Sequence, residues 1–167
     1  MTASPTQSTL KLLLVADSDS QLLACEALCS APTVLHVHWT INVIPRDGTP
    51  RALLERLAQR ATLHRQSLAR LLRDRRLQGF DAIGVFLTGS KLNDIRLALQ
   101  RNPQRPLLFC GFNGVVLDHF IEGLSWRLGY DLICLSGPRD QDALEQLVAG
   151  TPFAQQRTVL TGLRRNA

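Results

Sequence analysis

Short apolar runs alternate with stretches of helical periodicity along the whole chain. The apolar runs predict strands at residues 10–16, 34–44, 80–87, 107–112 and 131–135, with a short sixth strand at 158–160. Apolar positions spaced three and four residues apart predict helices at 21–31, 50–77, 90 to about 102, and 139–149. Residues 115–129 are ambiguous and in part helical. Strands that alternate with helices in this way are typical of a parallel sheet with crossover helices.

This order of elements predicts an α/β fold, a Rossmann-like doubly wound parallel sheet of five to six strands with helices on both faces. The chain has 167 residues, which suits one domain, and we place that domain at residues 10–163. Residues 1–9 and 164–167 are expected to be disordered tails. The N-terminal residues lack the charged and apolar regions of a signal peptide, and no apolar run reaches the ~20 residues of a membrane helix. A cytoplasmic protein is therefore expected.

The four cysteines agree with a reducing compartment. Cys110 and Cys134 lie in apolar, strand-like runs, where a thiol behaves as a small hydrophobic group. Cys25 and Cys29 share one face of a predicted helix, without a nearby histidine or further cysteine at ligand spacing. No metal site is predicted.

The positive charge is concentrated in one segment. The net charge is +5, and the segment from Arg51 to Arg76 holds eight arginines against Glu55 and Asp74. No aromatic residue is interleaved there, so specific nucleic-acid binding by base stacking is not expected. A solvated helix face is the commonest role of such a segment, and contact with an anionic membrane surface, peripheral at the inner membrane, is the alternative.

Four predicted strands end in small or polar residues. Because carboxyl ends of parallel strands meet at one edge of the sheet, these ends predict a ligand cleft. Backbone N–H groups at helix starts suit anions, and glycine lets a ligand approach the backbone. Ser and Asp are also common helix caps, so Asp19 or Ser20 could serve as a cap alone. The residues at these four ends are Asp17, Ser18, Asp19 and Ser20; Thr88, Gly89 and Ser90; Gly111, Asn113 and Gly114; Ser136 and Arg139.

Dinucleotide binding is not expected at this edge. The first predicted strand is not followed by the Gly-x-Gly-x-x-Gly pattern, and the chain has no Walker-type glycine–lysine loop.

Four segments, at residues 15–20, 111–114, 126–133 and 136–139, resemble a family of bacterial glycosyltransferases with the two-domain GT-B architecture. The similarity extends from residue 10 to about residue 163. It implies that this chain is the N-terminal, acceptor-side domain, which is not active alone. A sugar or a lipid-linked acceptor would bind at the rim residues named above. The donor, a nucleotide sugar, would bind to a C-terminal domain that this chain lacks, and no cofactor is expected here.

Glycosyl transfer needs a base near the acceptor hydroxyl, and Asp17, Asp19 and His119 are the candidates. Asp17 lies nearest the end of the first strand and is preferred. An alternative is a phosphatase of the haloacid-dehalogenase type, with Asp17 as nucleophile, Asp19 as acid and Thr88 as its second motif. Against this alternative, the chain has no acidic pair after a later predicted strand that could hold Mg²⁺. A non-catalytic ligand-binding module is the third hypothesis.

Overall fold

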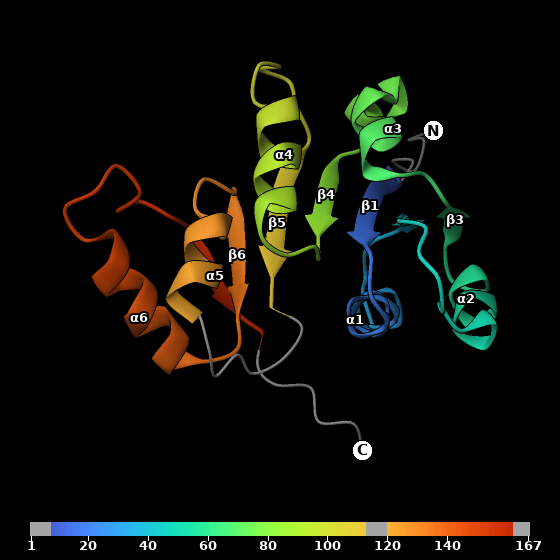
Figure 1. Cartoon of the computed structure of the whole chain (residues 1–167), viewed down its shortest axis with the longest axis horizontal. Coiled ribbons are helices and arrows are strands. Elements are labelled where there is room, and N and C mark those ends of the chain that lie inside the picture. Colours follow the sequence, from blue (N-terminus) through green and yellow to red (C-terminus); the bar gives the residue numbers. More distant parts are fainter. Residues whose placement is uncertain (1–7, 113–119, 162–167) are drawn as a thin grey trace, which may run out of the picture.

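The computed structural model describes residues 8–112 and 120–161. The predicted tails lie outside these ranges, apart from Ser8 and Thr9. Seven parallel strands form one sheet in the order β3-β2-β1-β4-β5-β6-β7 (Figure 1). They are β1 (Leu10–Ala16), β2 (Val37–Val43), β3 (Thr62–His64), β4 (Ala82–Val85), β5 (Leu107–Gly111), β6 (Leu132–Leu135) and β7 (Thr158–Leu160). The predicted doubly wound α/β fold is confirmed, with seven strands instead of five to six.

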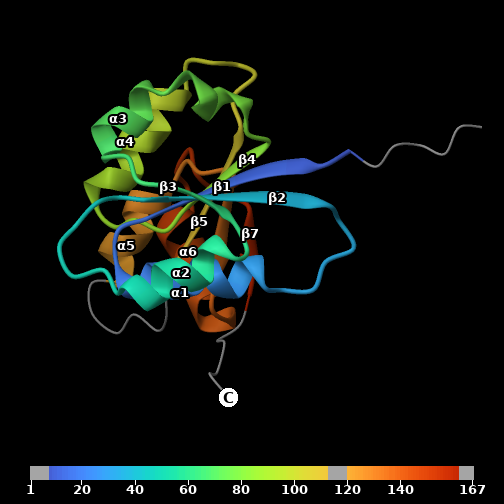
Figure 2. The same ribbon diagram turned by 90° about the vertical axis from the view of Figure 1, so that its right-hand side faces the viewer.

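Helices cover both faces of the sheet. They are α1 (Asp19–Cys29), α2 (Arg51–Ala58), α3 (Leu68–Arg73), α4 (Ser90–Leu99), α5 (Phe120–Arg127) and α6 (Pro138–Val148), with a 3₁₀ turn, η1, at Arg75–Gly79. Figure 2 shows α1 and α2 on one side of β1 and β2, and α3 and α4 on the other. The side chains of α5 and α6 pack into the same core as those of α3 and α4.

The position of β1 inside the sheet explains why residues 12–16 of this strand are an unbroken apolar run. Leu13 and Val15 pack towards α3 and α4, whereas Leu14 and Ala16 pack towards α1 and α2. All four side chains are fully buried. A strand buried on both faces needs apolar residues at every position, which is the pattern that predicted it.

The long helix expected at residues 50–77 is wrong. This stretch contains α2, then strand β3, then α3 and η1. Residues Thr62–His64 pair with β2 as a parallel edge strand, in the register Thr40↔Thr62 and Asn42↔His64. The leucine periodicity was misleading because α2 and α3 each present leucines to a core. The two helices lie on opposite faces of the sheet, so the basic segment is divided between two surfaces.

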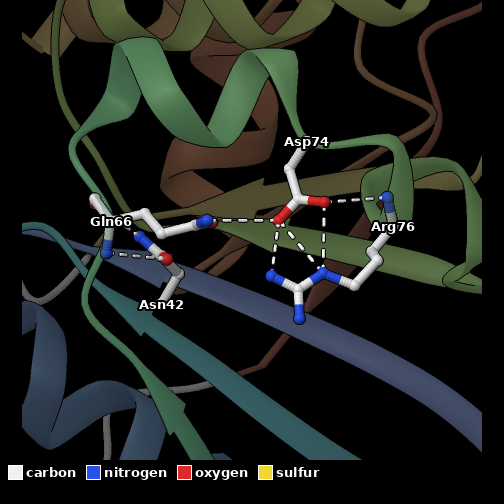
Figure 3. Close-up of polar contacts among 4 residues, drawn as sticks. All are labelled: Asn42, Gln66, Asp74 and Arg76. Carbon is white, nitrogen blue, oxygen red and sulfur yellow. Dashed lines mark hydrogen bonds and ion pairs between the residues drawn. The ribbon is translucent and has the colours of Figure 1, made fainter.

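A polar network that starts from the buried Asn42 and reaches the exposed Arg76 holds the connection between β3 and α3 (Figure 3). Asn42 is fully buried, and its amide donates to the Gln66 carbonyl at 3.0 Å and accepts from the Gln66 N–H at 3.3 Å. The Gln66 side chain donates to Asp74 at 3.2 Å. Asp74 also accepts from the guanidinium and the backbone N–H of Arg76, and these bonds hold the pKa of its carboxyl well below the usual range. The network therefore turns the chain from β3 into α3.

Arg127, at the end of α5, supports the carboxyl end of β5. Its Nε donates to the Gly111 carbonyl at 3.2 Å and its Nη1 to the Gly123 carbonyl at 2.7 Å. Its guanidinium lies 3.9 Å from the centre of the Phe112 ring, a cation–π contact. Burial lowers the pKa of this arginine, since the charged form loses hydration.

The residues just after α5 form hydrogen bonds with α4, with the loop before β5 and with β5 itself. The Tyr130 hydroxyl donates to the Leu92 carbonyl of α4 at 2.6 Å. The Asp131 carboxylate accepts two hydrogen bonds from Arg105, at 2.6 and 2.9 Å, and one from the Leu108 N–H at 2.7 Å. The segment at 126–133 that carries part of the family resemblance therefore has a structural role in this fold.

Candidate ligand-binding cleft at the carboxyl ends of the strands

A cleft of about 590 Å³ lies at the carboxyl end of β1. Here the sheet changes its direction of winding, because β2 lies on one side of β1 and β4 on the other. Ligands of doubly wound sheets bind outside the carboxyl ends of the strands at this point. The cleft is lined by Asp17, Ser18, Ser20, Gln21, Ile44, Pro45, Arg46, Thr88 and Lys91.

The turn between β1 and α1 is held rigidly by its own hydrogen bonds. The Asp17 N–H donates to the side-chain carbonyl of Gln21 at 2.7 Å. The Gln21 N–H donates to Ser18 Oγ at 3.3 Å, so Ser18 is the N-cap of α1. The cap predicted at Asp19 or Ser20 is therefore one or two positions too late. Gln21 is itself buried, which fixes the backbone that carries Asp17.

Two ion pairs cross the cleft. Lys91 Nζ contacts Asp17 Oδ2, and Arg46 Nη2 contacts Asp19 Oδ1. The Asp17 side chain is 15% exposed, whereas that of Lys91 is 47% exposed. The aspartate is thus the anchored member of its pair, and the lysine is the more solvated one.

Hydroxyl groups provide the remaining hydrogen-bonding capacity of the cleft. Ser18 Oγ and Ser20 Oγ lie 3.3 Å apart, and Thr88 follows β4. Gly89, the N-cap of α4, has φ = 60°, a conformation that L side chains rarely adopt. Gly89 and Ser90 begin α4 beside the cleft but do not line it.

The other predicted rim residues do not line this cleft. Gly111 is buried, and a Cβ there would lie 3.2 Å from the Cys134 Cβ, so close packing of β5 against β6 accounts for that glycine. Ser136 and Arg139 lie where β6 leads into α6. Asn113, Gly114 and the candidate base His119 lie outside the described residues.

Five cleft residues were missed from the sequence: the polar residues Gln21, Arg46 and Lys91, and the apolar residues Ile44 and Pro45. Arg46 follows β2 just as Asp17 follows β1, so the rule applied to the other strand ends would have found it. Lys91 comes one residue after Ser90, and its contact with Asp17 depends on the β1–β4 pairing.

Within residues 8–112 and 120–161, no group of three or more His, Cys, Asp or Glu side chains is placed to hold a metal ion. A search of the same residues finds no helix long and apolar enough to cross a membrane.

The fold and the cleft together define an α/β domain with a polar cleft at the reversal point of its sheet, where ligands of such folds commonly bind. Residues 12–165 match the family described as "Putative glycosyltransferase (DUF6716)", so the chain belongs to that family. The resemblance to a glycosyltransferase family is thereby confirmed. Comparison with curated proteins gives no match, and comparison with solved structures gives none either.

Proposed function

We propose that this chain is the acceptor-side, N-terminal domain of a two-domain GT-B glycosyltransferase, with Asp17 as the catalytic base. The observation that carries the proposal is the position of Asp17. It lies at the end of β1, where the sheet reverses its winding, in a cleft lined by hydroxyl groups, in a chain of a glycosyltransferase family. The substrate that receives the sugar is itself a sugar or a lipid-linked acceptor.

The reaction assigns roles to several polar residues in and beside the cleft. Asp17 takes the proton of the acceptor hydroxyl as its oxygen bonds to the anomeric carbon of the donor. The bond between that carbon and the nucleotide phosphate breaks, and the nucleotide leaves with the electron pair. Ser18, Ser20 and Thr88 hydrogen-bond to the other hydroxyls of the acceptor. Asp19 pairs with Arg46 and so positions that arginine at the edge of the cleft.

The hydrogen-bonded turn between β1 and α1 supports Asp17 as the base in preference to Asp19. A base must be held within hydrogen-bonding reach of the proton that it removes. The Asp17 backbone is fixed by Gln21, and its side chain is 15% exposed. The Asp19 side chain is 46% exposed and is outside the cleft lining.

The nucleotide sugar binds to a second domain in this proposal, so the 167-residue chain alone transfers no sugar. The first experiment is to sequence the locus beyond the codon for Ala167. A reading frame that continues into a second α/β domain agrees with the proposal, and a stop codon at that point overturns it.

The complete protein is then incubated with nucleotide sugars and a panel of acceptors. Asp17→Asn is expected to lower transfer by about 10²–10⁴-fold, the usual contribution of a general base. Asp94→Asn, an exposed position on α4, is the matched control and is expected to keep full activity. Undiminished transfer by Asp17→Asn, or transfer by the 167-residue chain alone, would contradict the proposal.

Contact of this domain with an anionic inner membrane stays a prediction. Of the arginines from Arg51 to Arg76, Arg51 pairs with Glu55, Arg56 pairs with Glu26 through two hydrogen bonds, and Arg76 pairs with Asp74. Binding of the protein to anionic vesicles at low salt, weakened by added salt, is the expected result.

A further inference from the structure

Both cations that line the cleft are held by carboxylates from other elements. Lys91, in α4, contacts Asp17, which follows β1. Arg46, which follows β2, contacts Asp19 in α1. Each pair therefore connects elements on two sides of the cleft mouth.

The Lys91 pair conflicts with the role of Asp17 as a base. Lys91 Nζ occupies Oδ2, one of the two carboxylate oxygens that could accept a proton from the acceptor hydroxyl. A neutral acceptor offers Lys91 no better partner, so it would leave the pair intact. An anionic acceptor would compete for the lysine.

Lys91 is the member of the pair that can move. Hydrogen bonds around Gln21 fix the backbone of Asp17, whereas Lys91 is about half exposed on a flexible four-carbon stem. Arg46 is exposed too, and its guanidinium can turn towards the same space. The two cations lie near three hydroxyls, those of Ser18, Ser20 and Thr88.

We propose that the acceptor carries a phosphoryl group, which Lys91 and Arg46 bind when they leave Asp17 and Asp19. A phosphoryl group presents several acceptor oxygens and up to two negative charges, so it can engage both cations and a hydroxyl together. Its binding releases Asp17 to act as base only when the correct acceptor is present. This inference rests on the proposed function, because it assumes the catalytic role of Asp17.

The chain offers a direct spectroscopic test. Lys11 and Lys91 are its two lysines, so protein labelled with ¹³C-lysine gives two Cε resonances that Lys11→Gln assigns. Lys11 lies at the opposite end of β1 and is the matched control. On titration with inorganic phosphate or glycerol 3-phosphate, the Lys91 resonance is expected to shift and the Lys11 resonance to stay in place.

Affinities of three variants test the exchange of partners. Lys91→Gln should weaken phosphate binding by about tenfold or more, since a charge-assisted hydrogen bond is lost. Lys11→Gln should leave it unchanged. Asp17→Asn should tighten it several-fold, because the lysine no longer has to leave a carboxylate. A residue with only a structural role would not give opposite effects of this kind. Circular dichroism checks that each variant folds. If Asp17→Asn does not fold, the phosphate affinity of Lys91→Gln alone decides the proposal.

The proposal is overturned if phosphate leaves the Lys91 resonance unmoved, or if Lys91→Gln binds as tightly as the parent protein. It is also overturned if a folded Asp17→Asn variant binds phosphate no more tightly. Vesicles of phosphatidylcholine with and without phosphatidic acid identify the source of the group. Binding to phosphatidic acid that depends on Lys91 assigns it to a lipid, and binding of glycerol 3-phosphate alone assigns it to a soluble acceptor.

Failure here is distinct from failure of the proposed function. The titrations measure anion binding by the 167-residue chain, whereas the transfer assay measures product formed by the complete protein. Transfer to an uncharged acceptor would overturn the phosphoryl proposal and leave the glycosyltransferase assignment intact.

Discussion

Replacement of Asn42 by leucine is expected to destabilise the protein by about 2–3 kcal/mol. The two side chains branch at the same carbon and have the same number of heavy atoms, although the methyl groups of leucine are bulkier than the amide. Leucine removes both hydrogen bonds to the backbone of Gln66, which join β2 to the connection that follows β3. Each bond contributes about 0.5–1.5 kcal/mol net, and a backbone group left unsatisfied adds a desolvation penalty of about 1–3 kcal/mol. Partial access of water to Gln66 keeps the total near the lower end of this sum.

Urea unfolding followed by circular dichroism measures this free energy. For a chain of this length, a loss of about 2–3 kcal/mol corresponds to a fall in Tm of roughly 4–12 °C. Hydrogen exchange adds a local test, since the Gln66 amide should lose its protection. Thr40→Val is the matched control, because Thr40 is buried on the same face of β2, and it should cost less than about 1 kcal/mol. A change below 1 kcal/mol for Asn42→Leu, or unchanged protection of Gln66, would refute the reasoning.

Three further predictions concern the rest of the scaffold. Asp131→Ala should destabilise the protein at neutral pH by about 2–3 kcal/mol, through loss of charge-assisted hydrogen bonds. Arg105 lowers the pKa of the Asp131 carboxyl, so this stabilisation is present above the unfolded-state pKa and is lost as the pH falls through the folded-state pKa. Urea titrations of parent and variant at several pH values test this. A difference in the free energy of unfolding that stays constant down to pH 2 would contradict it. Tyr130→Phe should cost about 1–2 kcal/mol in urea unfolding, since a buried carbonyl of α4 loses its donor, and an unchanged midpoint would argue against that bond. Burial raises the pKa of the Cys25 and Cys110 thiols, so a thiol reagent at pH 8 should modify them only after urea is added, and rapid labelling of the native protein would show that they are accessible.

The sequence was sufficient for the fold where burial left a pattern in the chain. The apolar run at residues 12–16 of β1 reflects burial on both faces of the sheet, and it predicted the strand correctly. Strand β7, at Thr158–Leu160, was also predicted, although it is an edge strand of three residues. Strand β3 was missed because its three residues leave no periodic pattern between two leucine-rich helices, and its pairing with β2 supplies the hydrogen bonds.

The candidate site, like the fold, could be predicted from the sequence only in part. Asp17, Ser18, Ser20 and Thr88 could be found from the sequence, because each follows an apolar run that must end at the same edge of a parallel sheet. The sequence could not show that Gly111 is needed for packing, since a turn and a tight contact both favour glycine.

The amino-acid sequence by itself thus determined the class of fold, the central strand and the edge at which polar residues gather. Those properties follow from local periodicity and from the burial that each element requires. The tertiary structure alone decided that residues 62–64 form a strand, that Asn42 pairs with Gln66, and that Lys91 faces Asp17 across 74 positions of the chain. Such contacts depend on which strands become neighbours in the sheet. In a sheet that winds in two directions from β1, segments far apart in the sequence become neighbours, and local sequence patterns do not specify which ones.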